Sequence, residues 1–227
     1  MASHGKKYRA VKEKAPEGMV DPREAIDFLR RNKTASFDET LELCLHMGVD
    51  PRKSENAIRG SVALPHGTGK DVRVVVFAAG AAADAAREAG ADEVGTDELV
   101  EKVKDGWTDF DVAIATPDAM KEVRKLGRVL GPRGLMPNPK TGTVTDDTAT
   151  AVREAKAGRV EFRMDRHGNI NVPFGKVSFE GDKLLENAGV VLAAIRAEKP
   201  AAARGEYIRT TTMTSTMGVG VRVNMRD

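Results

Sequence analysis

Both ends of the chain carry alternating patterns of apolar and polar residues. Between residues 37 and 47, apolar side chains occupy the odd positions from Leu41 to Met47, and polar side chains occupy the even ones. Successive side chains of a strand point to opposite faces, so this pattern predicts a strand with one buried face. The other β-like stretches are residues 58–64, a hairpin with strands 160–164 and 170–172 around the polar tip 165–169, and a last strand within residues 206–223.

Two helices complete these end segments. The first begins at Asp21 and Pro22, because Asp is a good helix cap and Pro suits the first turn, and it ends near residue 32. The second covers residues 182–198, with an apolar face, and stops before Pro200. The first twenty residues are rich in Lys and Arg. We expect them to form a flexible arm, an arm ordered by RNA, or a solubilising tail.

The middle of the chain has a different period. Residues 72–77 are almost all apolar, which is typical of a strand covered on both faces. Further short strands are expected at residues 93–94 and 111–115. They alternate with helices at 81–89, 96–104, 116–126 and 146–157. Alternating strands and helices predict a parallel or mostly parallel sheet with helices on both faces.

This order gives α+β ends around an α/β middle. The economical arrangement is a split α+β domain made of residues 1–67 plus 160–227, with residues 68–159 inserted as an α/β domain. The inserted part has 14 basic and 16 acidic residues, whereas the outer parts together have 22 basic and 18 acidic residues. This difference in net charge supports a division of labour between the two parts.

A proline-rich stretch, LGRVLGPRGLMPNPKTGT at residues 126–143, follows the helix expected at 116–126. Glycine and proline should break the helix there, leaving a rigid loop with positive charge. Such a loop suits either a secondary contact with RNA phosphates or a contact with the other domain. Its basic residues, with those just before it, are Lys121, Arg124, Lys125, Arg128, Arg133 and Lys140.

Composition narrows the classes of function. The net charge of the 227 residues is only +2, so any nucleic-acid contact must be local. The single cysteine, Cys44, allows no internal disulfide and favours a reducing compartment. No apolar run reaches the ~20 residues that span a bilayer. We therefore expect a cytoplasmic protein without a membrane partner.

No catalytic or cofactor motif stands out. Gly67-Thr68-Gly69-Lys70 resembles the end of a phosphate-binding loop, but a strand follows it where that motif needs a helix. The turn after residue 77 lacks the glycine pattern of a dinucleotide site. The four histidines are scattered, with no ligand spacing for a metal. The sequence predicts no enzyme, no cofactor and no metal site.

Several motifs together carry a resemblance that covers nearly the whole chain. They are HGKKYR at residues 4–9, FDET at 37–40, GVDPRKSENAIRGSVALPHG at 48–67, DGWTDFDVAIATPD at 105–118, LGRVLGPRGLMPNPKTGTV at 126–144, KAGRVEFR at 156–163 and STMG at 215–218. In these motifs the chain closely resembles the bacterial large-subunit ribosomal protein L-one family.

The resemblance implies a split α+β domain and an inserted, Rossmann-like three-layer domain without a cofactor. It implies a structural constituent of the large ribosomal subunit that binds ribosomal RNA at the mobile lateral stalk near the tRNA exit site. It also implies help in releasing deacylated tRNA, and repression of the protein's own operon by binding its mRNA leader. Off the ribosome the family favours a monomer.

The family's main RNA surface lies on the split domain. Carried over to matching positions, it implies RNA contacts for Phe37, Thr40, Glu42, Thr210, Thr216, Met217 and Gly218. From their own chemistry, Arg166 and His167 at the tip of the expected hairpin suit an added phosphate contact. Hydroxyl groups and a carboxylate can read ribose 2′-hydroxyls. Two departures from the family pattern, Ser36 in place of a cation and Val219 in place of a proline, put one phosphate contact and some rigidity in doubt.

Taken singly, these residues have plainer readings. Phe37 alone would suit a core position, and residues 216–218 would suit an ordinary edge strand. For the whole chain, two other functions compete with a specific RNA-binding ribosomal protein. One is a small-molecule enzyme or nucleotide binder that uses the middle domain. The other is a general RNA chaperone, whose binding would come from counterion release and discriminate little between RNAs.

Overall fold

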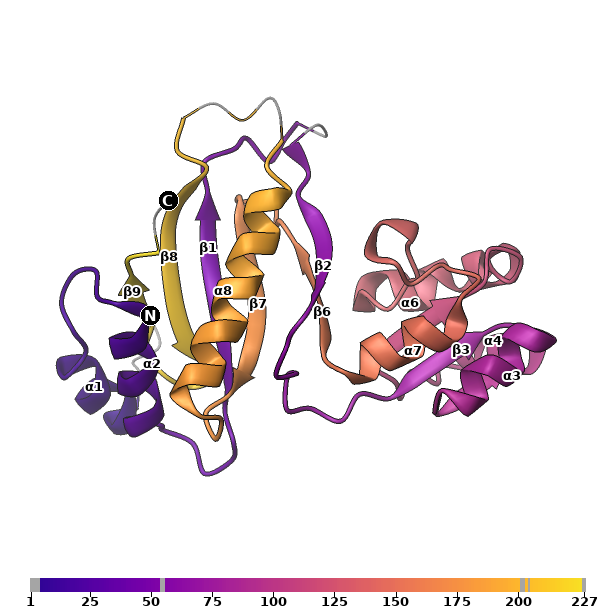
Figure 1. The fold of residues 1–227 in the computed structure, drawn as a ribbon, viewed down its shortest axis with the longest axis horizontal. Helices are drawn as coiled ribbons and strands as arrows, with labels where there is room; N and C mark the ends of the chain where they lie inside the picture. Colours follow the sequence, from indigo (N-terminus) through magenta and orange to yellow (C-terminus); the bar gives the residue numbers. More distant parts are fainter. Residues whose placement is uncertain (1–4, 54–55, 201–202, 204, 226–227) are drawn as a thin grey trace. The chain divides into compact units, whose positions relative to one another are not determined.

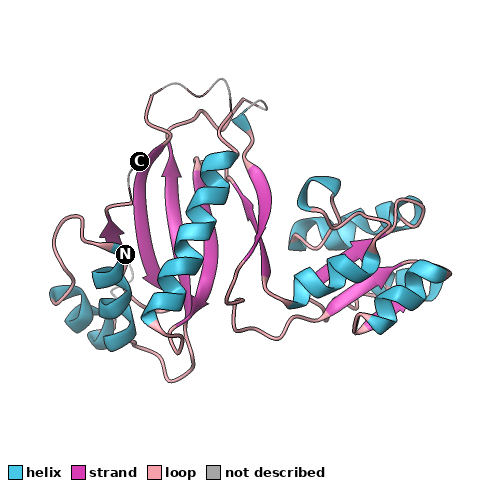
Figure 2. Ribbon diagram, in the orientation of Figure 1, coloured by secondary structure: helices cyan, strands magenta, loops and turns pink. Residues whose placement is uncertain are grey.

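The computed structural model describes residues 5–53, 56–200, 203 and 205–225. Contacts within the chain divide it into two compact units. One unit joins the residues up to Gly69 to those from Val160 onward, and is called the terminal unit below. The other contains Lys70–Arg159 and is called the central unit. The chain is thus a mixed α/β protein with several sheets (Figures 1 and 2).

The terminal unit is built on a four-stranded sheet with the order β7-β1-β8-β9. The strands are β1 (Thr40–Met47), β7 (Asn169–Lys176), β8 (Ile208–Ser215) and β9 (Val221–Val223). Strand β1 lies in the middle, antiparallel to both β7 and β8. A segment near the N-terminus is therefore held between two segments that lie more than 120 residues further along the chain.

The alternation along β1 is confirmed. Leu41, Leu43, Leu45 and Met47 are buried, and the residues between them are half-buried on the opposite face. The apolar face packs into a core shared with α2 (Pro22–Arg31) and α8 (Gly181–Ala197), and α8 crosses the sheet in Figure 1. One face of the sheet is therefore the core of this unit, and the other is left polar and accessible.

Helix α2 begins where the sequence predicts. The Asp21 carboxylate accepts a hydrogen bond from the backbone N–H of Arg23, and Pro22 occupies the first turn. The N-terminal arm, by contrast, contains a helix, α1 (Lys6–Glu13), with no buried residue. No helix in the part of the chain that the structure describes has the length and apolar character needed to cross a bilayer.

Two β predictions for this unit are wrong in their pairing. Strands β6 (Arg159–Arg163) and β7 do not form a hairpin, because β6 pairs with β2 (Arg59–Ala63) in a separate sheet while β7 pairs with β1. The expected long last strand is two strands, β8 and β9, which pair antiparallel. Gly218 and Gly220 lie between them. The alternation of a strand shows which of its faces is buried, but it does not show which other strand it pairs with.

The central unit has a parallel sheet with the order β4-β3-β5, formed by β3 (Val74–Phe77), β4 (Glu93–Gly95) and β5 (Val112–Ala115). Val75 and Phe77 face one apolar cluster, which contains α4 (Asp97–Lys104), α5 (Met120–Val123) and α6 (Gly127–Arg133). Val74 and Val76 face another, with α3 (Ala81–Glu88) and α7 (Thr148–Lys156). Both faces are covered, as the apolar run 72–77 predicts. Thr96 precedes α4, but its side chain makes no capping hydrogen bond.

The proline-rich stretch departs from its prediction at the start. The chain continues from α5 through a 3-10 turn, Arg124–Leu126, into α6, which contains Pro132 and ends at Arg133. Buried Leu126 and Leu130 keep this segment helical, because tertiary packing outweighs the weak local preference. Gly134 then ends the helix with φ +73°, and Leu135 N–H bonds the Leu130 carbonyl, which is a Schellman ending.

The loop beyond α6 is organised by threonines. The hydroxyl of Thr143 accepts a hydrogen bond from Asn138 N–H at 2.8 Å, and Thr141 is fully buried beside it. Val144 then forms a parallel bridge to Ala115 at the end of β5. The loop is therefore anchored to the sheet of the central unit.

The end of α6 gives a matched pair of glycine substitutions. Gly134→Ala should lower the free energy of unfolding by about 1–2 kcal/mol, because an L-residue is strained at positive φ. Gly127→Ala, at a helical φ with open space around the added methyl group, should raise it by about 0.5–1 kcal/mol. Urea unfolding of the two variants measures both values. Equal effects at the two positions would contradict the assigned helix ending.

Candidate nucleic-acid interface

Two segments from opposite ends of the chain meet where β1 begins. Thr216 N–H donates to the Thr40 carbonyl at 3.1 Å, and Thr40 N–H donates to the Thr216 hydroxyl at 3.0 Å. Thr34 adds a hydrogen bond from its hydroxyl to the Met217 carbonyl at 3.0 Å. Residues 34–40 and 215–218 therefore form one composite surface, which is called the clamp face below.

A buried carboxylate, Glu39, joins these segments, and its side chain is 0% exposed. Its Oε1 accepts hydrogen bonds from the backbone N–H groups of Thr34 at 2.9 Å and Ala35 at 2.8 Å. Its Oε2 accepts from the Ser215 hydroxyl at 2.6 Å and from Met217 N–H at 3.1 Å. A buried charge is tolerated only when it is well hydrogen-bonded, and these four donors meet that need.

Glu39 was missed by sequence reasoning, although a signal exists. It occupies an odd position in register with Leu41 and Leu43, so the alternation places its side chain on the buried face. An acidic residue at such a position demands partners. Their identity could not be read from the sequence, because Ser215 and Met217 lie more than 170 residues away.

The electrostatic state of Glu39 follows from these contacts. Burial by itself raises the pKa of this carboxyl group. The hydrogen bonds from Ser215, Ala35, Met217 and Thr34 lower it by more, so the pKa lies below its ordinary value of 4.5. The side chain is therefore ionised at neutral pH.

The clamp face presents two large apolar side chains to solvent. Phe37 is 52% exposed and Met217 is 57% exposed. The core interpretation of Phe37 is therefore wrong, and residues 216–218 form the turn between β8 and β9. Exposed apolar side chains on backbone that is held in place are suited to a contact with a partner.

The remaining predicted residues at this end have neighbours within the protein. The Thr40 hydroxyl accepts a hydrogen bond from Lys176 Nζ at 2.8 Å. Glu42 lies on the polar face of β1, opposite Thr214 of β8. At Gly218 an added Cβ would lie 2.2 Å from the Ser215 hydroxyl oxygen, so any other residue would force that hydroxyl to shift. Phe37, Thr40, Thr216, Met217 and Gly218 thus lie together, with Glu42 two residues further along β1.

Arg166, His167 and Thr210 lie at the other end of β1. His46 is opposite Thr210 in β8 and opposite Asn169 in β7, the strand that follows the 165–168 turn. Thr40 and His46 are six residues apart, or roughly 20 Å at 3.4 Å per residue. The predicted RNA-binding residues therefore form two groups, one at each end of the central strand.

The tip at residues 165–168 is a tight turn. The Asp165 carboxylate accepts hydrogen bonds from the N–H groups of His167 and Asn169, each at 2.8 Å. Backbone bonding to Asn169 is the main cause that lowers the pKa of Asp165. The side chains of Arg166 and His167 remain exposed. The turn therefore holds a cation at the end of the sheet.

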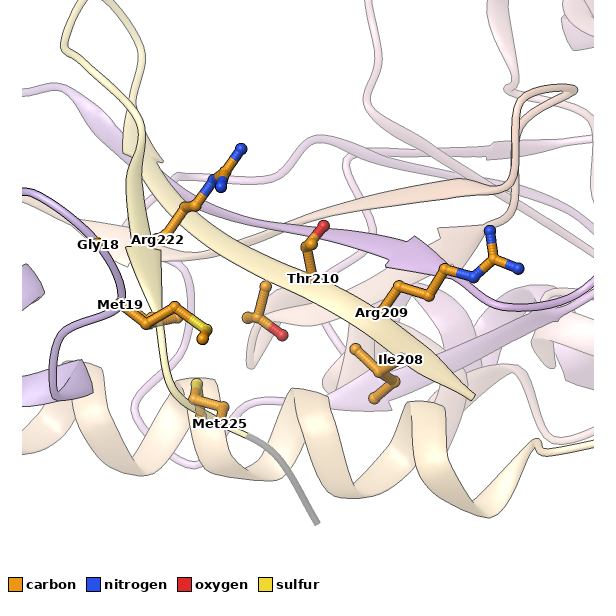
Figure 3. A pocket seen from close by; sticks show the side chains of 9 residues that line it. Gly18, Met19, Ile208, Arg209, Thr210, Arg222 and Met225 are labelled. Atoms are coloured by element: carbon orange, nitrogen blue, oxygen red, sulfur yellow. The ribbon is translucent and has the colours of Figure 1, made fainter. Parts of the chain in front are cut away.

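Figure 3 shows the surroundings of Thr210. The residues drawn there line a cavity of about 230 Å³, and Thr210 and Arg222 are among them. The side chains of Thr210 and Arg222 point to one side of the β8–β9 hairpin, and those of Met19, Ile208 and Met225 point to the other. Arg222 is exposed and lies opposite Thr212 in the pairing of the two strands. It adds to the polar sheet face a cation that sequence reasoning did not include.

Comparison with known proteins identifies the family, and the match covers both segments of the clamp face. The model of the ribosomal protein L1p/L10e family matches residues 29–219. The chain is also 56% identical over 205 residues to the large ribosomal subunit protein uL1 of Protochlamydia amoebophila (strain UWE25), covering 90% of this chain and 87% of the relative. The chain belongs to the ribosomal protein L1p/L10e family. The resemblance seen in the sequence motifs is confirmed, and this family is one of structural ribosomal proteins and not of enzymes.

The central unit of this L1 family member carries the predicted basic residues on a helical stretch. Lys121, Arg124, Lys125 and Arg128 have the spacing i, i+3, i+4 and i+7, which places them on one helical face, and all four are exposed. Lys125 forms an ion pair with Glu122 at 2.6 Å. These four cations are called the stripe below. Arg133 lies apart from the stripe, and its guanidinium group donates a hydrogen bond to the Thr108 hydroxyl. The side chain of Lys140 lies outside the described residues.

The central unit also has a cavity of about 420 Å³ at the carboxyl ends of β3 and β5, where related α/β folds bind ligands. Phe77 and Thr116 line its floor. Its carboxylates, Asp97, Asp118, Glu122 and Asp146, oppose the binding of phosphate groups. In the described parts of the chain, no cluster of three or more His, Cys, Asp or Glu residues is arranged to hold a metal ion.

The ionisation of Glu39 predicts a pH dependence of stability. Because its pKa is lower in the folded state, its contribution is complete at neutral pH and is lost as the pH falls below 4.5 toward the folded value. At pH 7, Glu39→Gln should reduce the free energy of unfolding by about 1–3 kcal/mol, since an amide cannot accept all four hydrogen bonds. Urea unfolding between pH 7 and pH 3 should show the difference from wild type shrinking in acid. A constant difference would contradict the assignment.

Proposed function

We propose that the chain binds large-subunit ribosomal RNA at the mobile lateral stalk through the clamp face and the polar face of the terminal-unit sheet. One observation carries the proposal: Phe37 and Met217 are held exposed on two segments that Glu39 joins. Membership of the L1p/L10e family and the name of the uL1 relative support ribosomal RNA as the partner.

The chemistry of the two ends of β1 suits a structured RNA. Phe37 offers a ring for packing on a base or ribose, and the carboxylate of Glu42 accepts hydrogen bonds from 2′-hydroxyl groups. Arg166 and His167, at the other end of the sheet, suit phosphate oxygens. With about 20 Å between the two groups, the proposed contact extends along an RNA helix and recognises its shape.

The stripe formed by Lys121, Arg124, Lys125 and Arg128 is proposed as a secondary RNA contact. Its four cations are exposed, and the apolar side of the same helical segment is buried by Val123, Leu126 and Leu130, so the stripe faces outward from the central unit. Contacts from such residues position an RNA through its phosphates and contribute little to specificity.

The finer roles proposed for the chain rest on the family. They are repression of its own operon through an mRNA leader that offers the clamp face the same RNA shape, and assistance in releasing deacylated tRNA at the exit site. We also propose that the chain is a monomer off the ribosome, that it acts in the cytoplasm as part of the ribosome, and that the two compact units are domains joined by a hinge.

The clamp-face proposal predicts a loss of specific affinity. Phe37→Ala combined with Met217→Ala should weaken binding to a stalk-junction fragment of large-subunit ribosomal RNA by roughly 10- to 100-fold, because base stacking contributes about 1–3 kcal/mol. The dependence on salt should stay unchanged, since the cations that meet phosphates are all kept. Filter binding at several salt concentrations, with a scrambled RNA of equal length, measures both effects. Unchanged affinity of the double variant would remove these residues from the site.

For the stripe, we expect substitutions to change the salt dependence of RNA binding, which the clamp-face substitutions should leave unchanged. Replacing Lys121, Arg124 and Arg128 by Gln should lower the slope of log affinity against log salt by about 0.7–0.9 for each phosphate that the protein no longer neutralises. A matched control replaces three cations of the same unit that are already ion-paired, Arg87, Lys102 and Lys156. The control changes net charge equally and should keep the slope. Equal slopes for the two triple variants would count against a defined contact.

A further inference from the structure

We propose that Glu39 is the positioning residue of the RNA contact: it fixes Phe37 and Met217 in the arrangement that binds. This inference rests on the proposed function of the clamp face. Glu39 is 0% exposed, so it cannot touch an RNA itself. Any effect of Glu39 on RNA affinity must therefore pass through the residues to which it is hydrogen-bonded.

The bonding pattern of Glu39 defines what it positions. One carboxylate oxygen holds the backbone at Thr34 and Ala35, just before Phe37, at 2.9 and 2.8 Å. The other holds the backbone N–H of Met217 itself at 3.1 Å. The two exposed apolar side chains thus belong to segments that are bonded to opposite oxygens of one side chain.

Preorganisation is the physical benefit of this arrangement. Large side chains on loose loops must be ordered when a partner binds, and that loss of freedom weakens the affinity. With Glu39 in place the ordering takes place during folding, because burial of the carboxylate is tolerable only when all its donors are present. The free protein therefore already holds the geometry that we propose RNA requires.

Gly218 contributes to the same arrangement around Glu39. The family resemblance implies an RNA contact for this glycine. In the structure, a Cβ at this position would lie 2.2 Å from the Ser215 hydroxyl oxygen, the atom that donates to Glu39 at 2.6 Å. We therefore assign the glycine to the integrity of the clamp face, and Gly218→Ala should resemble the loss of Glu39.

The test compares Glu39→Gln with Asp92→Asn, a matched exchange in the central unit. Asp92 accepts a hydrogen bond from Val74 N–H at 2.8 Å and pairs with Lys156 at 3.2 Å. Binding of the full chain to the stalk-junction RNA and to its scrambled counterpart is measured at several salt concentrations, after circular dichroism has shown each variant to be folded. Glu39→Gln should bind the stalk RNA about tenfold more weakly with an unchanged salt slope, while Asp92→Asn should bind as wild type does.

A double-mutant cycle separates positioning from general destabilisation. In a background that already carries Phe37→Ala and Met217→Ala, Glu39→Gln should change affinity by less than about twofold. Ser215→Ala keeps the carboxylate and removes one donor, so it should give a smaller loss in the same direction. This milder variant tests the proposal even where Glu39→Gln does not fold.

The outcomes distinguish the two proposals. Wild-type protein that binds both RNAs alike overturns the proposed function and this inference with it. If the wild type discriminates while folded Glu39→Gln and Ser215→Ala bind equally well, the inference alone fails. It fails too if Glu39→Gln loses its full tenfold in the background that lacks Phe37 and Met217.

Discussion

The pairing of β1 with both β7 and β8 is the constraint on which the terminal unit depends. Because β1 is the central strand, its start must lie beside the end of β8, and its end must lie beside the turn that precedes β7. That one arrangement brings Phe37 beside residues 215–218 and brings Arg166 to the far end of the same sheet. The proposed RNA surface is a consequence of antiparallel register.

Strand register alone does not fix the segments that flank the strands, residues 34–39 and 216–218. The hydrogen bonds of buried Glu39 hold these segments together. An ionised carboxylate without exposure is costly unless donors surround it, and Glu39 obtains them from both segments. The same bonds that satisfy the charge hold exposed apolar groups in place. One side chain therefore contributes both to the stability of this end of the sheet and to the geometry of the proposed contact surface.

The central unit differs from the terminal unit in how its sheet is covered and in where its charges lie. Its sheet is covered on both faces, so its outer surface is helical, and its charges are segregated. Cations lie along one face of the Met120–Arg133 stretch, while carboxylates surround the crevice where a nucleotide would bind in a related fold. This distribution suits an accessory phosphate contact better than a small-molecule site. It agrees with membership of a family of structural proteins.

Local patterns predicted the elements well, and their failures have a common cause. Asp21 and Pro22 mark the start of α2, and the apolar run of β3 marks a strand covered on both faces, because caps and periodicity act within a few residues. The 160–172 hairpin was wrong because β6 could pair with any exposed edge, and β2 supplied it. The helix through Pro132 was missed because buried Leu126 and Leu130 outweigh a local breaker.

The sequence by itself determined which residues face the core, where most helices begin, and, through its motifs, the family. It placed Phe37 and Met217 in one proposed site without showing how they are held there. Only the tertiary structure decided that the residues proposed for RNA binding lie in two groups at the two ends of β1, and that Glu39 joins the segments of one group. The physical reason is range: alternation and capping are local, whereas a hydrogen bond between Glu39 and Ser215 exists only after the chain has folded.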